Sequence, residues 1–276
     1  MEVKMAVPTI KLSDKLSIPQ VGLGTWQIKD QTKCIETIKT GLKDGYRHFD
    51  TAQIYDNEQF IGQALKDSGI SRKNLFITTK IWTMNFLSSR VIPSFEKSLS
   101  KLQTDYVDLL LLHFPVPKLR HSAWKKMEEI HDSGKAKSIG VSNYTIKHLE
   151  RLLGDCRVRP VVNQVELHVF LQQPELLKYC AAQGIVVEAY SPLAHSYGLD
   201  NPVLARIAKK HAKSPAQIML RWCVEVGAVP LPKSSTAERI AENIDIFNFK
   251  LDSGDLAELK ALDANHRTCW DPTRIP

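Results

Sequence analysis

The sequence of 276 residues has little of what marks membrane and secreted proteins. No apolar run approaches the roughly 18–20 residues that are needed to cross a bilayer. The first residues, Met1-Glu2-Val3-Lys4-Met5, lack the apolar core of a signal peptide. We therefore expect no membrane partner and a cytoplasmic location.

Paired cysteines are also lacking. The five cysteines are odd in number and scattered, with no C-x-x-C pair. This pattern argues against a disulfide framework and against a zinc site. We expect free thiols in a reducing compartment and no metal.

Concentrated charge is the third absence. The formal net charge is +7, but the basic residues are spread along the chain, in short clusters such as Lys125-Lys126 and Lys209-Lys210. Both clusters fall in predicted helices, where they indicate solvated faces. The charge supports a weak preference for anionic ligands, and we expect no nucleic-acid partner.

The glycine fingerprint of dinucleotide-binding folds is incomplete. Gly22-Leu23-Gly24 supplies its first two glycines, but Gln27 stands where G-x-G-x-x-G requires the third. A nucleotide would have to bind in another way.

What the chain does have is an alternation of strand and helix patterns. Residues 8–19 predict a hairpin that turns at Ser13-Asp14-Lys15. Strands are predicted at 21–26, 47–50, 75–80, 106–113, 138–142, 161–166, 185–190 and 228–231. Helices are predicted at 32–44, 58–68, 88–102, 122–133, 145–153, 174–183, 202–211, 215–226, 236–243 and 253–262. Asp108 interrupts the apolar strand at 106–113 and requires a buried partner.

This alternation, without a linker or a repeat, predicts an α/β fold in which residues 1–276 form a single (β/α)8 TIM barrel domain. An N-terminal β-hairpin precedes the barrel, and extra C-terminal helices follow it. An open doubly wound sheet is the alternative, but eight units in about 250 residues fit the closed barrel better.

Chemically active residues recur where the predicted strands end. Asp50, Lys80 and His113 close the second, third and fourth strands, and Tyr55 follows Asp50 in a loop. Neighbouring strands of a barrel would gather them at its carboxyl end. Such a cluster suits proton transfer to a carbonyl oxygen: tyrosine titrates near pKa 10, and we expect a nearby ammonium to lower that pKa. An acid would hold the lysine, and a histidine could position a carbonyl. Taken singly, a structural ion pair and a satisfied histidine are the better interpretations, but four such residues together favour catalysis.

The segment after the eighth strand provides a phosphate site. Ser235 and Glu238 have capping-box spacing, and Lys233 and Arg239 flank the helix start. Helix N-termini bind anions through their free N–H groups. The alternative is an ordinary capped surface helix.

Over essentially its whole length the sequence resembles the aldo-keto reductases. The motifs that carry the resemblance are Gly22-Leu23-Gly24-Thr25-Trp26, residues 45–58, Thr79-Lys80-Ile81-Trp82, Leu112-His113-Phe114-Pro115, Val141-Ser142-Asn143, Asn163-Gln164-Val165-Glu166-Leu167, Tyr190-Ser191-Pro192-Leu193 and Pro232-Lys233-Ser234. It is most similar to the bacterial 2,5-diketo-D-gluconate reductases, through residues 50–58 and 101–108.

The resemblance implies NADPH-dependent reduction of aldehydes and ketones, with small α-dicarbonyls such as 2,5-diketo-D-gluconate or methylglyoxal as substrates. Tyr55 would donate the proton with help from Lys80 and Asp50, and His113 would orient the substrate. Tyr190 would stack on the nicotinamide. Its carboxamide would be held by Ser142, Asn143 and Gln164. The other implied cofactor residues are Gly24, Thr25, Trp26, Asp50, Ser191, Leu193, Lys233, Ser234, Ser235, Thr236, Arg239 and Asn243. The implied substrate pocket is formed by Trp26, Tyr55, Trp82, His113 and Phe114.

Two features depart from the family pattern. Residues 194–201 are too few for the long strap that covers the cofactor in some members, and Phe114 replaces the usual tryptophan. The tail at 267–276 carries Trp270 and is not placed by any pattern. We expect a monomer with a small-molecule carbonyl substrate. The alternatives are a catalytically silent barrel that acts as a regulatory or structural subunit, and a lyase or isomerase of sugar phosphates.

Overall fold

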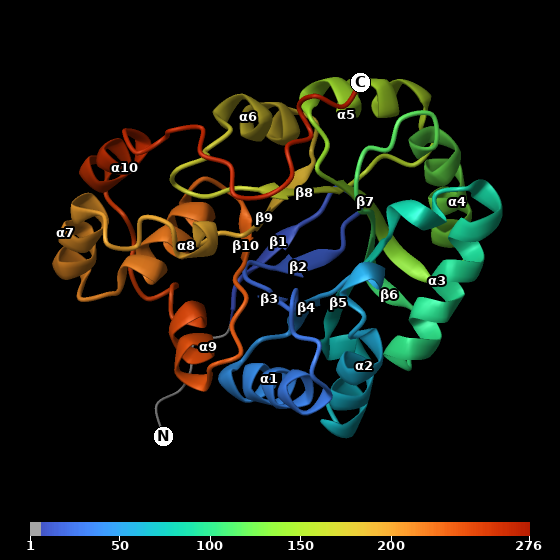
Figure 1. Ribbon diagram of the computed structural model, residues 1–276, viewed down its shortest axis with the longest axis horizontal. Helices are drawn as coiled ribbons and strands as arrows, with labels where there is room; N and C mark the ends of the chain where they lie inside the picture. The colour runs from blue at the N-terminus through green and yellow to red at the C-terminus, as the bar shows by residue number, and fades with distance from the viewer. Residues whose placement is uncertain (1–6) are drawn as a thin grey trace.

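A ring of parallel strands forms the centre of the computed structural model, which describes residues 7–276 (Figure 1). The strands are β3 Leu23–Gly24, β4 His48–Asp50, β5 Phe76–Ile81, β6 Val107–Leu112, β7 Ala136–Ser142, β8 Val162–Glu166, β9 Val186–Tyr190 and β10 Val229–Leu231. Each pairs in parallel with its neighbour in chain order. The predicted barrel is therefore confirmed. Met1–Met5, where we expect no signal peptide, lie outside the described residues.

The barrel closes where its first and last strands meet. Gly24 bridges Lys233 in parallel, and Gly24 N donates to the carbonyl oxygen of Pro232 at 3.0 Å. A Cβ on Gly24 would lie 3.0 Å from the carbonyl oxygen of Leu231, which is tighter than most Cβ contacts. Glycine is needed here because the two backbones approach so closely. The first strand is correspondingly shorter than the predicted 21–26, because only Leu23–Gly24 pairs with β4 as a strand.

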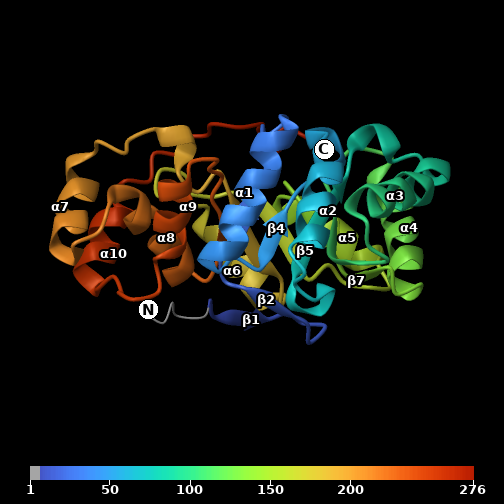
Figure 2. The same ribbon diagram turned by 90° about the horizontal axis from the view of Figure 1, so that it is seen from below.

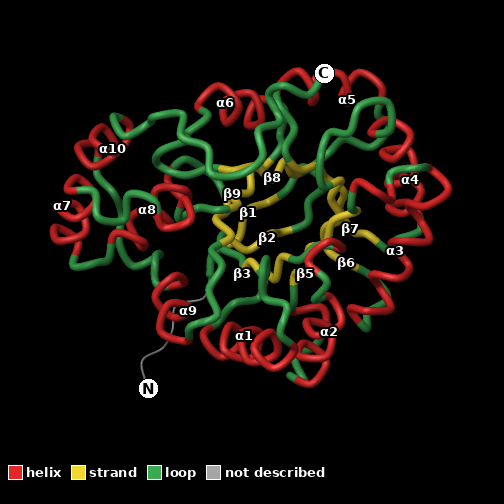
Figure 3. The backbone as a smooth tube through the Cα atoms, in the orientation of Figure 1, coloured by secondary structure: helices red, strands yellow, loops and turns green. Residues whose placement is uncertain are grey.

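Helices form a layer outside the strands, red around yellow in Figure 3. They are α1 Gln31–Asp44, α2 Glu58–Asp67, α3 Ser88–Leu102, α4 Arg120–Asp132, α5 Ile146–Asp155, α6 Pro174–Ala182, α7 Pro202–His211, α8 Pro215–Glu225, α9 Ala237–Ile244 and α10 Ser253–Lys260, with short 3₁₀ turns η1 Gln53–Tyr55, η2 Arg72–Asn74, η3 Thr83–Asn85 and η4 Ala194–Ser196. Two helices, α7 and α8, separate β9 from β10, and α10 follows α9. These are the extra helices predicted for the C-terminal part.

The first helix shows how local sequence produces this layer. The side chain of Asp30 accepts from Lys33 N and starts α1, and Gly45 ends it in the left-handed conformation with φ 107°. Cys34, Ile38 and Leu42 recur every four residues and are buried against the barrel.

A hairpin covers one end of the barrel. β1 Thr9–Lys11 and β2 Ser17–Pro19 pair antiparallel around the predicted turn. Leu12 and Ile18 belong to a buried cluster with residues at the starts of strands, such as Phe76 and Val229. In Figure 2 the hairpin lies along the lower edge and the red C-terminal segment along the upper edge. The amino end of the barrel is therefore closed, and the tail crosses the carboxyl end.

The buried acid in β6 has the partner that the sequence requires. Arg72 Nη2 donates to Asp108 Oδ2 at 2.6 Å, and the backbone N of Ile77 donates to the same oxygen at 2.9 Å. The charge inside an apolar strand is thus compensated. All five cysteines are free thiols, as expected. Among residues 7–276 no helix is long and apolar enough to cross a bilayer.

Candidate active site

Neighbouring strands bring the predicted residues together at the carboxyl end of the barrel. Asp50 ends β4, Lys80 lies near the end of β5, and His113 follows β6 directly. The turn η1 carries Tyr55 back over Lys80. The four residues therefore form one cluster, as the strand ends predict.

Lys80 is the centre of this cluster. Its Nζ donates to Asp50 Oδ1 at 2.6 Å, to the carbonyl oxygen of Thr51 at 2.9 Å and to Tyr55 Oη at 3.5 Å. The residue is fully buried, with 0% exposure. A buried ammonium needs a partner for its charge and acceptors for its hydrogens, and this lysine has both.

Lys80 lowers the Tyr55 pKa as expected, but this effect does not decide the net shift. Burial of the phenol raises its pKa, Lys80 lowers it, and Asp50 raises it again; the net shift is upward. Desolvation is the largest effect, and the Asp50 carboxylate, 2.6 Å from Lys80 Nζ, opposes the effect of the ammonium. Tyr55 is therefore a protonated phenol at neutral pH, the state that a proton donor requires.

His113 lies beside this phenol as a neutral imidazole. Its ring is 5.8 Å from the Tyr55 ring, between centroids, and nearly perpendicular to it. Burial and then Lys80 hold the His113 pKa well below its usual value. The buried Nδ1 has no hydrogen-bond partner among the described residues.

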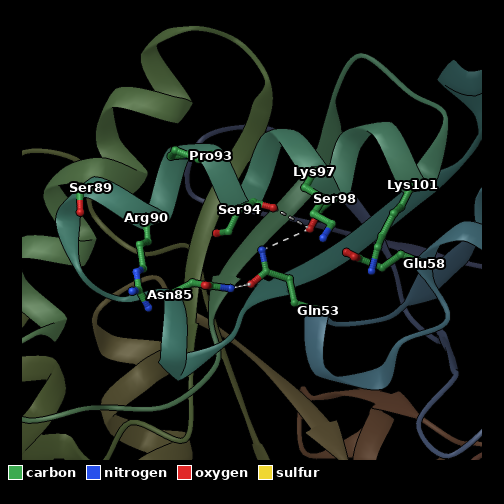
Figure 4. Close-up of a pocket in the computed structure, with 10 residues that line it drawn as sticks. All are labelled: Gln53, Glu58, Asn85, Ser89, Arg90, Pro93, Ser94, Lys97, Ser98 and Lys101. Carbon is green, nitrogen blue, oxygen red and sulfur yellow. Dashed lines mark hydrogen bonds between the residues drawn. The ribbon is translucent and has the colours of Figure 1, made fainter.

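Gln53 holds the turn that carries Tyr55. Its Oε1 accepts from Trp82 N and Asn85 Nδ2, both at 2.9 Å, and its Nε2 donates to Ser98 Oγ at 3.2 Å. Figure 4 shows the contacts of Gln53 with Asn85 and Ser98, beside a pocket of about 410 Å³ that Lys97 also lines. The turn that carries Tyr55 is thus tied to α3, a contact that the sequence patterns did not indicate.

Aromatic side chains stand next to His113. Trp82 lies 5.3 Å from the His113 ring, and Trp270 of the tail lies 5.8 Å from Trp82 and 6.1 Å from Phe114, all between centroids. Trp26 instead stacks on His195, at 5.6 Å. The predicted pocket residues Trp82 and Phe114 are therefore joined by Trp270, while Trp26 contacts the connection after β9.

Buried polar groups hold the tail in place at both ends. The fully buried Glu166 accepts from Thr268 N and Oγ1, both at 2.6 Å, and from Cys269 N at 3.2 Å. At the chain end, Arg120 Nη1 donates to the Pro276 oxygen at 2.7 Å. Trp270 lies between these two attachments.

A connected set of amides and hydroxyls adjoins His113. Tyr190 Oη donates to Asn143 Oδ1 at 2.7 Å, Asn143 Nδ2 donates to the His113 carbonyl oxygen at 3.0 Å, and Ser142 Oγ donates to the Gln164 carbonyl oxygen at 2.9 Å. The residues implied for the nicotinamide are thus close together and already oriented by hydrogen bonds.

The connection from β9 to α7 is short and has unusual backbone geometry. Ser191, Ala194, His195 and Ser196 all have positive φ, between 47° and 71°. Non-glycine residues in this region are strained, and such residues gather at ligand sites. Ser191 Oγ lies 3.0 Å from His195 Nε2 and 3.4 Å from Cys269 Sγ. Leu193 is half-buried in the same connection.

The predicted capping box at Ser235 is wrong. Helix α9 begins one residue later, with Thr236 at the N-cap and no side-chain cap. Ser234 Oγ accepts from Thr236 N at 3.1 Å, so a local turn replaces the expected cap. The first N–H groups of α9 consequently lack a side-chain partner from the cap.

Two basic residues flank the N-terminus of α9 in the sequence. Lys233 and Arg239 are exposed. In the described part of the chain neither forms an ion pair within 4.0 Å. Asn243 is buried on the same helix. Free N–H groups with two unpaired cations are a donor set that fits a phosphate group.

The sequence patterns did not identify Glu188 in β9 as a residue of the site. It is fully buried beneath the cluster and accepts from Gln164 Nε2 at 2.9 Å. Its signal was in the sequence, because an acid interrupts the apolar strand Val186-Val187-Glu188-Ala189 just as Asp108 interrupts β6.

Comparisons with known proteins agree with this geometry. The model of the Aldo/keto reductase family matches residues 20–264. The chain is 43% identical to the glyoxal reductase of Bacillus subtilis over 97% of each chain. It is 45% identical to the methylglyoxal reductase DkgA of Escherichia coli K12, over 98% of this chain and 99% of that one. Among solved structures, the Bombyx mori aldo-keto reductase in complex with NADP superposes with a TM-score of 0.90 at 35% identity, over 95% of each chain.

Proposed function

Because the chain belongs to the aldo/keto reductase family, we propose that it reduces small α-dicarbonyl compounds such as methylglyoxal and that Tyr55 donates the proton. That it is an NADP-dependent oxidoreductase follows from the family and from relatives solved with the cofactor. The substrate and the role of each residue are the proposed part.

The residues of this chain fit NADPH at two places. The open N-terminus of α9, with Lys233 and Arg239, suits the phosphate of the adenosine half. Tyr190, Asn143 and Gln164 suit the nicotinamide half, because an aromatic ring and two amides match a flat ring with a carboxamide. When bound, NADPH supplies a hydride to the carbonyl carbon.

The proton for the carbonyl oxygen comes from this chain. A carbonyl oxygen placed between Tyr55 Oη and the neutral His113 would accept a hydrogen bond from each. As negative charge grows on that oxygen, the Tyr55 proton moves to it and an alcohol results. Lys80, 3.5 Å from Tyr55 Oη, stabilises the phenolate that remains, and Asp50 keeps Lys80 charged.

The pocket favours small substrates. Trp82 contacts the His113 ring, Trp270 contacts both Trp82 and Phe114, and the tail that carries Trp270 is held at both ends. Two of the relatives are named for glyoxal and methylglyoxal, which supports the same substrate class. The single observation that carries the catalytic proposal is the hydrogen-bonded series Asp50–Lys80–Tyr55.

A panel of carbonyl compounds tests the substrate class. With NADPH in excess, methylglyoxal, glyoxal and 2,5-diketo-D-gluconate should give higher kcat/KM values than steroid ketones or bulky aromatic ketones. Steroid ketones at the top of the panel would refute the proposed substrate. Absence of NADPH consumption with every carbonyl would instead favour a silent barrel.

A further inference from the structure

Glu188 lies in the barrel interior, one residue layer below the catalytic cluster. It has 0% exposure and occupies the middle of β9, between Val187 and Ala189. A buried carboxyl group is costly, so such a group normally has a specific hydrogen-bonding task.

Its partner is the side-chain amide of Gln164. Gln164 Nε2 donates to Glu188 Oε2 and to Asp50 Oδ2, both at 2.9 Å. A side-chain amide nitrogen has two hydrogens, and both are held here. Gln164 Oε1 accepts no hydrogen bond from the described residues, so it is the only free polar atom of this amide.

The buried charged groups around Gln164 are compatible with its hydrogen bonds to Asp50 and Glu188. Lys80 and Asp50 form one neutral pair, and burial together with Lys80 lowers the His48 pKa to about 3, so His48 is neutral. Burial and then Asp50 raise the Glu188 pKa to about 8. The raised pKa favours the protonated, uncharged form of this buried carboxyl group. Its Oε1 faces His48 Nε2 at 3.5 Å, and its Oε2 stays available as the acceptor for Gln164.

We propose that Glu188 is a positioning residue: together with Asp50 it holds both hydrogens of the Gln164 amide, so that this amide can present only its oxygen to the nicotinamide carboxamide. Without Glu188, Asp50 alone would hold one of the two hydrogens, and the orientation of the amide would be less restricted. The inference rests on the proposed placing of the nicotinamide at Gln164, and it does not depend on which carbonyl is reduced.

The test is a double-mutant cycle read out by NADPH binding. Dissociation constants from fluorescence quenching are measured for wild type, Glu188→Met, Gln164→Met and the double variant. Methionine keeps the length of each side chain and removes its polar end. Glu188→Met should weaken NADPH binding about tenfold, which corresponds to about 1.4 kcal/mol. In the Gln164→Met background the same change should have less than about a twofold effect, because the amide that Glu188 orients is gone.

The conservative variant separates positioning from packing. Glu188→Gln keeps an acceptor oxygen for Gln164 and should restore wild-type NADPH binding, and the melting temperature of each cofactor-free variant reports on folding. Unchanged binding in a folded Glu188→Met, or an equal loss in both backgrounds, would overturn the inference while leaving the proposed reaction intact. A wild-type protein that does not bind NADPH would overturn both.

Discussion

At the scale of single residues, burial and the Lys80 charge have opposing effects on the protonation state of Tyr55. Desolvation raises the pKa of the phenol and Lys80 lowers it, with desolvation the larger effect. The phenol therefore keeps its proton until substrate arrives. Lys80 matters for the phenolate that is formed once the proton has left.

Tyr55→Phe removes the hydroxyl group of the proposed proton donor but keeps the ring. Since general acid catalysis contributes about 10²–10⁴-fold, kcat for methylglyoxal should fall by at least about 10²-fold. The dissociation constant for NADPH should stay near the wild-type value. Single-turnover rates with saturating NADPH measure the chemical step. A variant that kept a third or more of the rate would contradict the assignment.

Lys80→Met adds the pH dependence to this prediction. Because Lys80 lowers the Tyr55 pKa, its removal should raise that pKa further. The rate should fall, and the alkaline inflection of the pH–rate profile should move to higher pH. A move to lower pH would show that another group titrates.

At the scale of elements, the N-terminus of α9 has no side-chain cap, so its N–H groups are available to a ligand. Its first N–H groups have no side-chain partner from the cap, and Arg239 is exposed on its first turn. An adenosine 2′-phosphate could accept hydrogen bonds from these N–H groups and from the Arg239 side chain. We therefore expect NADPH to be preferred over NADH through this element.

Arg239→Ala should weaken NADPH binding by one to two decades, since charge-assisted hydrogen bonds are worth about 1.5–3 kcal/mol. NADH binding should barely change, because NADH has no 2′-phosphate. The dissociation constants of both cofactors, measured by fluorescence quenching, test this prediction. Lys209→Ala on α7 is the control, because it removes a positive charge away from α9. Equal losses for both cofactors would make Arg239 a structural residue of its helix.

At the scale of the whole molecule, the chain end contributes to the proposed substrate pocket. Trp270 comes from the last ten residues, yet it contacts Trp82 after β5 and Phe114 after β6. Glu166 and Arg120 hold the two sides of this tail. That residues 1–276 form a single domain, and that the protein is a cytoplasmic monomer, stay predictions.

Trp270→Ala should widen the pocket without disturbing the core, because 58% of this side chain is exposed. The ratio of kcat/KM for a bulky aromatic aldehyde to that for methylglyoxal should rise by about tenfold, the effect of about 1.4 kcal/mol. Trp270→Phe keeps a ring at this position and should change the ratio much less. An unchanged ratio in the alanine variant would show that the tail does not set substrate size.

The sequence alone determined the features that depend on local periodicity. Alternating strand and helix patterns predicted the barrel, and polar residues at strand ends predicted that Asp50, Lys80 and His113 would meet. Side-chain periodicity and strand direction are local properties, so they can be read before folding. The acidic residue Asp108 inside an apolar strand likewise predicted a buried partner, and the structure shows that this partner is Arg72.

Only the tertiary structure decided which groups compete for each hydrogen bond and how far each is removed from water. Thr236 N donates to Ser234 in a local turn and α9 starts one residue later than predicted, and the desolvation of Tyr55 exceeds the effect of Lys80. Glu188 meets Gln164 inside the barrel, and Trp270 reaches Trp82 from the far end of the chain. These outcomes depend on distances between segments that are remote in sequence, and no local pattern encodes such distances.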